Sequence, residues 1–216
     1  ADIMLDLALR LVWRKLLKRH REEPQFAVVA YGKLGGKELG YASDLDIVFL
    51  YDDDAPEAPE LYARLGQRMN TWISSQTAAG VLFETDLRLR PNGESGLLVS
   101  SIDAFRRYQL ESAWPWEHQA LTRARFAAGD VQLARSFESI RREVLCQQRD
   151  RDELRGEVKA MRQKMMDAHG SHGSPQFDLK QDRGGLIDVE FLVQYLVLGH
   201  AHDFPQLADN IGNIGL

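Results

Sequence analysis

A glycine-rich segment between two apolar runs constrains the fold of this chain more than any other feature. Residues 32–36 contain three glycines, and Asp44 and Asp46 stand beyond them after seven intervening residues. The apolar runs over 26–31 and 45–51 have the length and composition of buried strands. The sequence therefore predicts a strand, a tight glycine turn and a second strand that begins at the aspartates.

The two aspartates and the glycines together indicate a chemistry. Side chains alternate along a strand, so Asp44 and Asp46 face the same way. Their mutual repulsion costs roughly 4 kcal/mol at about 4 Å and an effective dielectric near 20. A divalent cation removes that cost, and hard oxygen ligands suit Mg²⁺. Gly35 and Gly36 allow close backbone approach to a ligand, and amide groups at such a turn suit phosphate oxygens. This combination predicts a nucleotide-transfer site.

Composition excludes several other classes. The 216 residues are 44% hydrophobic and 27% charged, as in an ordinary globular protein. A formal charge of −5 argues against a general nucleic-acid or membrane-surface binder. Cys146 is the only cysteine, which excludes an intrachain disulfide and fits a reducing cytoplasm. No apolar run reaches membrane-spanning length. We therefore expect a cytoplasmic protein without nucleic-acid or membrane partners, and a fragment of a longer polypeptide because the chain begins without Met.

The remaining patterns are mainly helical. Helices are predicted over 3–21, 57–78, 114–126, 131–145, 150–169 and 188–198, with a short one over 33–39 and another that starts at Ser101. A turn over 91–96 and a short strand over 97–100 precede Ser101. The acidic run 52–54 reads as a solvated loop, and 170–175 as a flexible connection.

A second informative stretch covers residues 81–90. Strict alternation there predicts a strand with Leu87 and Leu89 on one face, and places four charged residues on the other: Glu84, Asp86, Arg88 and Arg90. Unpaired buried charges are costly, so a fully charged strand face indicates a cleft or a metal. A half-exposed edge strand is the alternative explanation.

Four blocks, taken in order, resemble the signature of one family. They are Gly32 to Asp46, Asp86 to Pro91, Trp116 to Leu121 and Gly184 to Phe191, and the resemblance runs from about Phe26 to Leu198. The family is the bacterial glutamine synthetase adenylyltransferases. It implies an α/β (α+β) fold: a polymerase-beta-like nucleotidyltransferase core with a mixed sheet, followed by a mainly helical region. We expect the first domain over 1–146, with its leading helix, and a truncated helical domain over 147–216.

The resemblance also implies an activity and partners. Full-length members hold two copies of this domain: one adenylylates a tyrosine of glutamine synthetase, and the other removes AMP by phosphorolysis. The block 114–125 resembles the adenylylating copy. The family implies ATP as substrate, Mg²⁺, and control by glutamine and the signal protein PII. Two alternatives stay open: the deadenylylating copy, and a non-catalytic module that binds a nucleotide or a regulator.

Site residues follow from the pattern and the resemblance together. Asp44 and Asp46 are expected to hold Mg²⁺, and Asp86 to complete the carboxylate set as a ligand or as a general base. The expected nucleotide-binding residues are Gly35, Gly36, Ser43, Lys33, Arg88 and Arg90, with Lys37 a further candidate for balancing triphosphate charge. Trp116, Glu117 and Arg123 are candidates for lining the cleft. Asp188 suits a helix start, where a negative charge complements the helix dipole.

Overall fold

The protein folds into two compact units that alternate along the chain. The computed structural model describes residues 1–170 and 177–214, so most of the predicted connection over 170–175 lies outside the described residues. Ala1–Ala113 and Arg123–Arg141 form the first unit, and Trp114–Thr122 with Arg142–Leu216 the second. The sheet lies in the first unit and the second is helical, so the expected α/β core with a helical region is confirmed.

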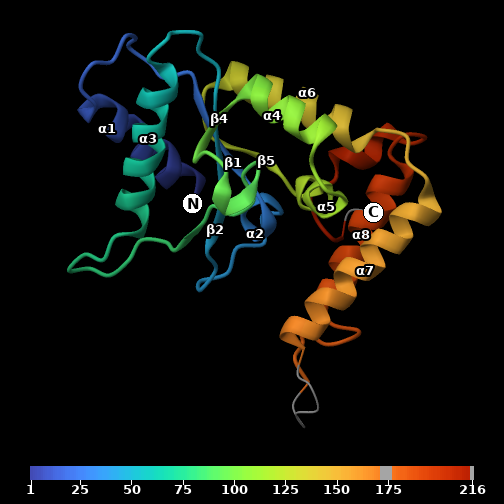
Figure 1. The fold of residues 1–216 in the computed structure, drawn as a ribbon. Helices are drawn as coiled ribbons and strands as arrows, with labels where there is room; N and C mark the ends of the chain where they lie inside the picture. Colours follow the sequence, from blue (N-terminus) through green and yellow to red (C-terminus); the bar gives the residue numbers. More distant parts are fainter. Residues whose placement is uncertain (171–176, 215–216) are drawn as a thin grey trace. The chain divides into compact units, whose positions relative to one another are not determined.

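A mixed five-stranded sheet organises the first unit (Figure 1). Its strands are β1 (Phe26–Ala30), β2 (Leu45–Tyr51), β3 (Thr85–Asp86), β4 (Val99–Ser101) and β5 (Arg125–Gly129). β1 pairs antiparallel with β2 on one side and with β5 on the other. β3 and β4 both run parallel to β2. The two strands predicted around the glycine turn are confirmed.

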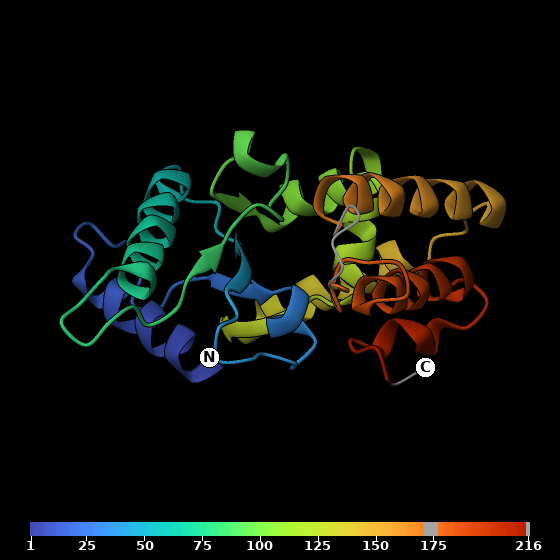
Figure 2. The same ribbon diagram turned by 90° about the horizontal axis from the view of Figure 1, so that it is seen from below.

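Two helices cover one face of this sheet. α1 (Asp2–Lys15) and α3 (Ala58–Ser74) lie side by side, as Figure 2 shows, and pack on the inward side chains of β1 and β2. Leu45, Ile47 and Phe49 of β2 belong to this core. Because side chains alternate along a strand, Asp46 points to the opposite face. Because the apolar side chains of β2 are buried against α1 and α3, the Asp46 carboxylate points away from these helices.

The helix that follows β4 begins as predicted. Ser101 caps α4 (Ile102–Glu111) by accepting a hydrogen bond of 3.2 Å from Ala104 N. α4 contacts β2 and β4, and its Phe105 packs against Phe137 of α6 (Val131–Leu145) with ring centroids 5.9 Å apart. The bounds predicted for α6 are confirmed.

α1 and α3 are both shorter than predicted. α1 ends at Lys15 rather than Arg21, because Leu17 stays exposed and the residues over 18–23 are all polar, so a longer helix would bury nothing more. The chain instead turns back, and Trp13 Nε1 donates a hydrogen bond of 2.8 Å to Glu22 O. α3 ends at Ser74 rather than 78, and Ser75 is already extended.

Two predictions about strands were wrong: one strand was missed, and another was predicted too long. The helix predicted over 114–126 stops at Thr122, and β5 occupies residues where the end of that helix and a break at 129–130 were expected. Pairing with β1 overrides the good helix propensity of this alanine-rich run. The strand predicted over 81–90 is reduced to β3, which a turn at Arg88 ends.

The acidic run after β2 is only partly solvated, which corrects its prediction as a solvated loop. The Asp53 side chain is 1% exposed. It accepts hydrogen bonds of 2.8 Å from Tyr62 Oη and 3.1 Å from Ala55 N, and pairs with His20 at 2.8 Å and Arg21 at 3.1 Å. Burial alone would raise the pKa of Asp53, but the hydrogen bonds and the Arg21 charge lower it below its usual value. Asp53 thus anchors the loop after α1 to α3.

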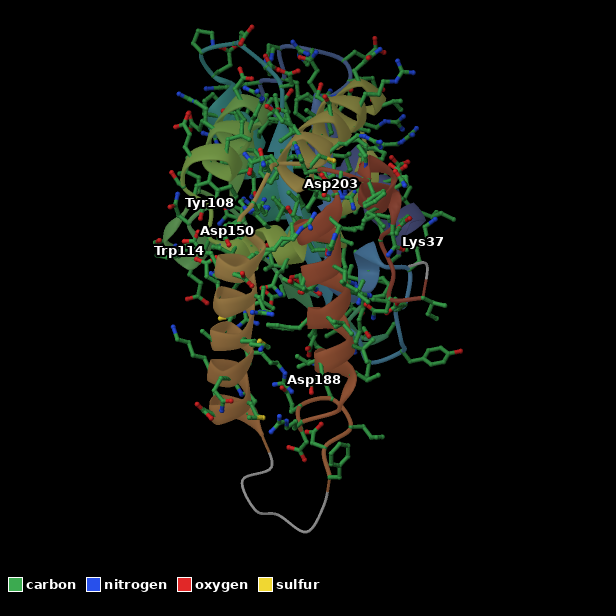
Figure 3. The ribbon with its side chains drawn as sticks, turned by 90° about the vertical axis from the view of Figure 1, so that its right-hand side faces the viewer. Lys37, Tyr108, Trp114, Asp150, Asp188 and Asp203 are labelled. Carbon is green, nitrogen blue, oxygen red and sulfur yellow. The ribbon has the colours of Figure 1, made fainter. Side chains whose placement is uncertain are left out.

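The second unit is built on an antiparallel helix pair. In α7 (Arg151–His169) and α8 (Leu186–His200), the start of one helix lies by the end of the other, where Figure 3 labels Asp150 and Asp203. Arg151 Nε donates a hydrogen bond of 2.9 Å to Gly199 O and forms an ion pair with Asp203. Asp150 caps α7, whose bounds agree within one residue with the helix predicted over 150–169. None of the described helices is both long and apolar enough to cross a bilayer.

A short helix from earlier in the chain completes this unit. α5 (Pro115–Thr122) packs on α7 and α8. Its buried Gln119 donates a side-chain hydrogen bond of 3.1 Å to the buried Gln194 of α8. A single 3-10 turn, η2 (Pro205–Asp209), follows α8, and Arg142 reaches it through an ion pair of 2.5 Å with Asp209. We retain the domain boundary at residue 146 as a proposal, although α5 belongs to the second unit.

Candidate active site

Three carboxylates converge at the edge of the sheet. Asp44, Asp46 and Asp86 each offer one oxygen, and these oxygens all lie within 4.8 Å of one another. The parallel register of β2 and β3 places Asp46 beside Asp86, and Asp44 stands immediately before β2. Asp44 is exposed and the other two are half-buried. The structure thus brings together the three aspartates that the sequence selected from two separate stretches.

The donor set fits a hard divalent cation. Three carboxylate oxygens at this spacing repel one another, and Mg²⁺ favours such oxygen ligands. Gly32 leaves room beside them: its φ is +51°, and a Cβ there would overlap Asp46 Oδ2. A side chain at position 32 would therefore both strain the backbone and displace a candidate ligand.

Arg88 contacts Asp86 from the turn that follows β3, and not from a shared strand face. Its Nε donates hydrogen bonds of 3.0 and 2.9 Å to the two carboxylate oxygens, and its backbone N donates one of 2.8 Å. The hydrogen bond from the Arg88 side chain lowers the pKa of Asp86 despite partial burial, so this carboxyl stays ionised. The Arg88 side chain remains 71% exposed, which leaves it able to turn toward a ligand.

Arg90 is directed elsewhere. Its guanidinium donates hydrogen bonds of 2.7 Å to Leu87 O, 3.1 Å to Glu94 O and 3.4 Å to Gly96 O. The expected alternation that placed Arg90 beside Asp86 was wrong, because the strand ends at Asp86. In this structure Arg90 stabilises the turn after β3, and its contact with phosphate stays a prediction.

The glycine turn forms a single helical turn, α2 (Gly32–Gly35), shorter than the expected helix. Gly35 N donates to Tyr31 O at 2.7 Å, and Gly36 N to Gly32 O at 3.0 Å. A Cβ at Gly35 would overlap the backbone oxygen of Arg123, and one at Gly36 would overlap its guanidinium. The structure thus gives both glycines a packing role, and their approach to phosphates stays a prediction.

Two arginines, Arg123 and Arg125, hold this turn in place, a function that was not predicted from the sequence. The buried Arg123 pairs with Glu38 at 2.7 Å. Arg125 donates hydrogen bonds of 2.9 Å to Leu34 O and 3.0 Å to Gly35 O, the last carbonyls of α2. It also forms a two-pronged ion pair with Asp2 at 2.8 and 3.0 Å. Recognising residues 125–129 as a strand would have directed attention to Arg125.

Comparison with known protein families identifies the family to which this sequence is similar. The family model for glutamate-ammonia ligase adenylyltransferase matches residues 1–140. The chain belongs to this family.

Relatives match over the whole chain. A protein of Aromatoleum aromaticum is 72% identical over 216 residues, one of Nitrosomonas europaea 62% and one of Chromobacterium violaceum 60%. Each is described as a bifunctional glutamine synthetase adenylyltransferase/adenylyl-removing enzyme. The chain spans about a quarter of their length, 23 to 24%. The resemblance expected from the four sequence blocks is therefore confirmed.

Three of the other contacts expected for this adenylyltransferase-family chain, Lys33, Lys37 and Ser43, lie on the same turn or shortly after it. Lys33 is exposed on α2, and Lys37, also exposed, follows it with a φ of 58°. Ser43 Oγ accepts a hydrogen bond of 3.1 Å from Gly40 N, so its hydroxyl proton is available to a ligand. Trp116 and Glu117 belong to the second unit. The roles of all these residues at the nucleotide stay predictions.

Proposed function

We propose that this chain carries an adenylyl-transferring active site, which moves AMP from ATP to a tyrosine of glutamine synthetase. The observation that carries the proposal is the convergence of Asp44, Asp46 and Asp86 to within 4.8 Å beside the glycine turn. Nucleotidyl transfer needs charge stabilisation and positioning more than covalent chemistry from the protein. A carboxylate cluster that can bind a cation next to exposed lysines and an arginine meets that need.

The roles follow from position and charge. Asp44, Asp46 and Asp86 would hold Mg²⁺, which supplies positive charge to the triphosphate. Lys33 and Arg88 add positive charge, and Ser43 offers a hydroxyl donor. The tyrosine oxygen attacks the α-phosphorus, the bond to the β-phosphate oxygen breaks, and pyrophosphate leaves. The phenol, with a pKa near 10, loses its proton on the way; Asp86 is our candidate acceptor, as the alternative to its role as a metal ligand.

The reverse-acting copy is the second candidate, because the relatives are described as both transferring and removing. Both reactions can use the same carboxylates, so the cluster alone does not give the direction. The resemblance of 114–125 to the adenylylating copy favours transfer. A non-catalytic module is a weaker candidate, because a mere binder has no need of three mutually repelling carboxylates. Control by glutamine and PII, and a cytoplasmic location, are further parts of the proposal.

Mass spectrometry of glutamine synthetase in two incubations tests the proposal. With unmodified glutamine synthetase, ATP and Mg²⁺, we expect a gain of one AMP on a tyrosine. With adenylylated glutamine synthetase and inorganic phosphate, we expect little release of ADP. The Asp46→Asn variant should be inactive in both, while Asp54→Asn, an exposed aspartate outside the cluster, serves as the control. ADP release without AMP attachment would assign this chain to the removing copy.

A further inference from the structure

A groove runs between α7 and α8, and all of its lining residues belong to the second unit. It has a volume of about 550 Å³, within the usual range for sites that bind small molecules. The α7 wall carries side chains at spacings of three and four residues, which places them on one helix face. Figure 3 labels Asp188 in the first turn of α8, at the end of the groove away from Asp150 and Asp203.

Positive charge dominates the lining. Four cationic side chains contribute to it, Arg155, Lys159, Arg162 and Arg183, against the single carboxylate of Asp188. That carboxylate is already engaged, since it accepts hydrogen bonds from Arg162 Nε and from Gly184 N. A local excess of positive charge in a chain with a formal charge of −5 is a specific feature of this groove.

Arg162 has one unsatisfied edge. Its side chain is 12% exposed, and its Nε and Nη2 donate to Asp188 and, at 2.8 Å, to Gln181 O. Nη1 is buried and has no hydrogen-bond acceptor among the residues that the structure describes. A buried donor on a charged group is costly when it is left without an acceptor. With one edge held in place, the guanidinium keeps its positive charge at the wall of the groove, and an anion that displaces the atoms covering Nη1 would give it the missing acceptor.

The opposite wall is apolar. Phe191, Leu192 and Tyr195 of α8 line it, and Leu192 is 57% exposed. An exposed leucine beside an aromatic ring gains free energy when a ligand covers it. A charged wall facing an apolar wall suits a ligand that has both characters.

We propose that this groove binds a small organic anion, in which a carboxylate or phosphate group is joined to an apolar or aromatic body. The anionic group would accept hydrogen bonds from Arg162 Nη1, with Lys159 and Arg183 supplying further positive charge. The body would lie against Phe191 and Leu192. The inference is independent of the proposed transfer reaction, because it rests only on residues of the helix pair.

Calorimetric titration with naphthyl phosphate tests it, in the presence of EDTA so that the carboxylate cluster stays free of metal. We expect naphthyl phosphate to bind at least tenfold more tightly than inorganic phosphate or the uncharged naphthalenemethanol. Lys159→Glu should weaken the binding of naphthyl phosphate at least tenfold. Lys164→Glu is the matched control: it makes the same charge change on the same helix outside the lining, and should alter affinity less than about twofold at physiological salt.

A third variant tests the buried edge directly. Arg162→Lys keeps the positive charge but removes the Nη1 donors, so we expect weaker binding. The thermal midpoint of this variant reports whether the protein is folded. If Lys159→Glu does not fold, Lys159→Gln replaces it. Absence of naphthyl phosphate binding would overturn the proposal, as would equal losses in the variants at 159 and 164. Equal affinity for inorganic phosphate would overturn the apolar part. Tighter binding of an acidic peptide would assign the groove to a protein partner instead.

Discussion

Arg88 and Asp86 illustrate how one residue can affect two ligands in opposite directions. Arg88 occupies both oxygens of Asp86, so it competes with a cation for them and repels it. We expect Arg88→Ala to raise the affinity for Mg²⁺ alone by about 1.4- to fivefold, the range that a surface ion pair of about 0.2–1 kcal/mol allows. The same variant should weaken binding of a non-hydrolysable ATP analogue with Mg²⁺, since it removes a positive charge.

Calorimetry with each ligand separates the two effects. Arg64→Ala is the control, because Arg64 pairs with Glu60 on α3 and lies outside the cluster. Affinities for the metal and for the nucleotide analogue that move in the same direction would show that Arg88 does not have this double role.

Asp53 gives a prediction for the pH dependence of stability. The pKa of Asp53 is lowered in the folded protein by its hydrogen bonds and by Arg21, against the effect of burial. Its contribution to stability is therefore present above the unfolded pKa near 3.9 and is lost as the pH falls through the lower folded pKa. Asp53→Asn should reduce the free energy of unfolding by about 1–3 kcal/mol at pH 7, and the difference from wild type should shrink in strong acid.

Urea unfolding at a series of pH values measures this. The exposed neighbour Asp54 offers a matched control, and Asp54→Asn should stay within about 0.5 kcal/mol of wild type throughout. A difference between Asp53→Asn and wild type that persists unchanged to pH 2 would contradict the linkage.

The α2 turn depends on close packing that only glycine permits. Because a Cβ at Gly35 would overlap Arg123 O, we expect Gly35→Ala to destabilise the protein by about 1–3 kcal/mol. Gly156 in α7 has open space around it, so Gly156→Ala should instead stabilise by about 0.5–1 kcal/mol through helix propensity. Chemical denaturation of both variants compares one substitution in two environments. If the two substitutions change the free energy of unfolding by similar amounts, backbone entropy, and not the Arg123 contact, explains the effect at Gly35.

The elements with strong local signals were predictable. β2 is recognised from its apolar run, and α7 from its helical spacing of apolar residues such as Leu154 and Val158, because those signals lie within the segments themselves. β5 was missed because its partner β1 lies about a hundred residues earlier, and alanines that pair as a strand also suit a helix. The length of β3 was overestimated because strict alternation continues into a turn that Arg90 stabilises through backbone carbonyls.

The candidate site was predictable to a similar degree. The aspartates at 44, 46 and 86 could be chosen because alternation fixes the direction of carboxylates along a strand, and the structure places them together. Arg123 and Arg125 could not be given their positions under α2, since that contact requires β5 to be in place. Long-range contacts of this kind have no signature in a local pattern.

The interleaving of the two units leads to a prediction about truncation. Residue 146 was the expected end of the first domain, yet α5 uses α8 to bury Gln119, which pairs with Gln194. A chain that ends at 146 keeps α5 but loses that partner, and a buried amide without its hydrogen bond is costly. We therefore expect the backbone amides of α5 to exchange hydrogen at least on the order of tenfold faster in the shortened chain.

Hydrogen exchange followed by mass spectrometry supplies the comparison, with β1 as the internal reference because its five residues are buried within the first unit. Gln194→Ala in the whole chain isolates the hydrogen bond from the loss of α8, and should speed exchange in α5 less than truncation does. If α5 is protected equally in the shortened and the whole chain, the boundary at 146 is sufficient and α5 folds with the sheet. If only α5 loses protection while β1 keeps it, α5 belongs to the second unit although it precedes β5 in the chain.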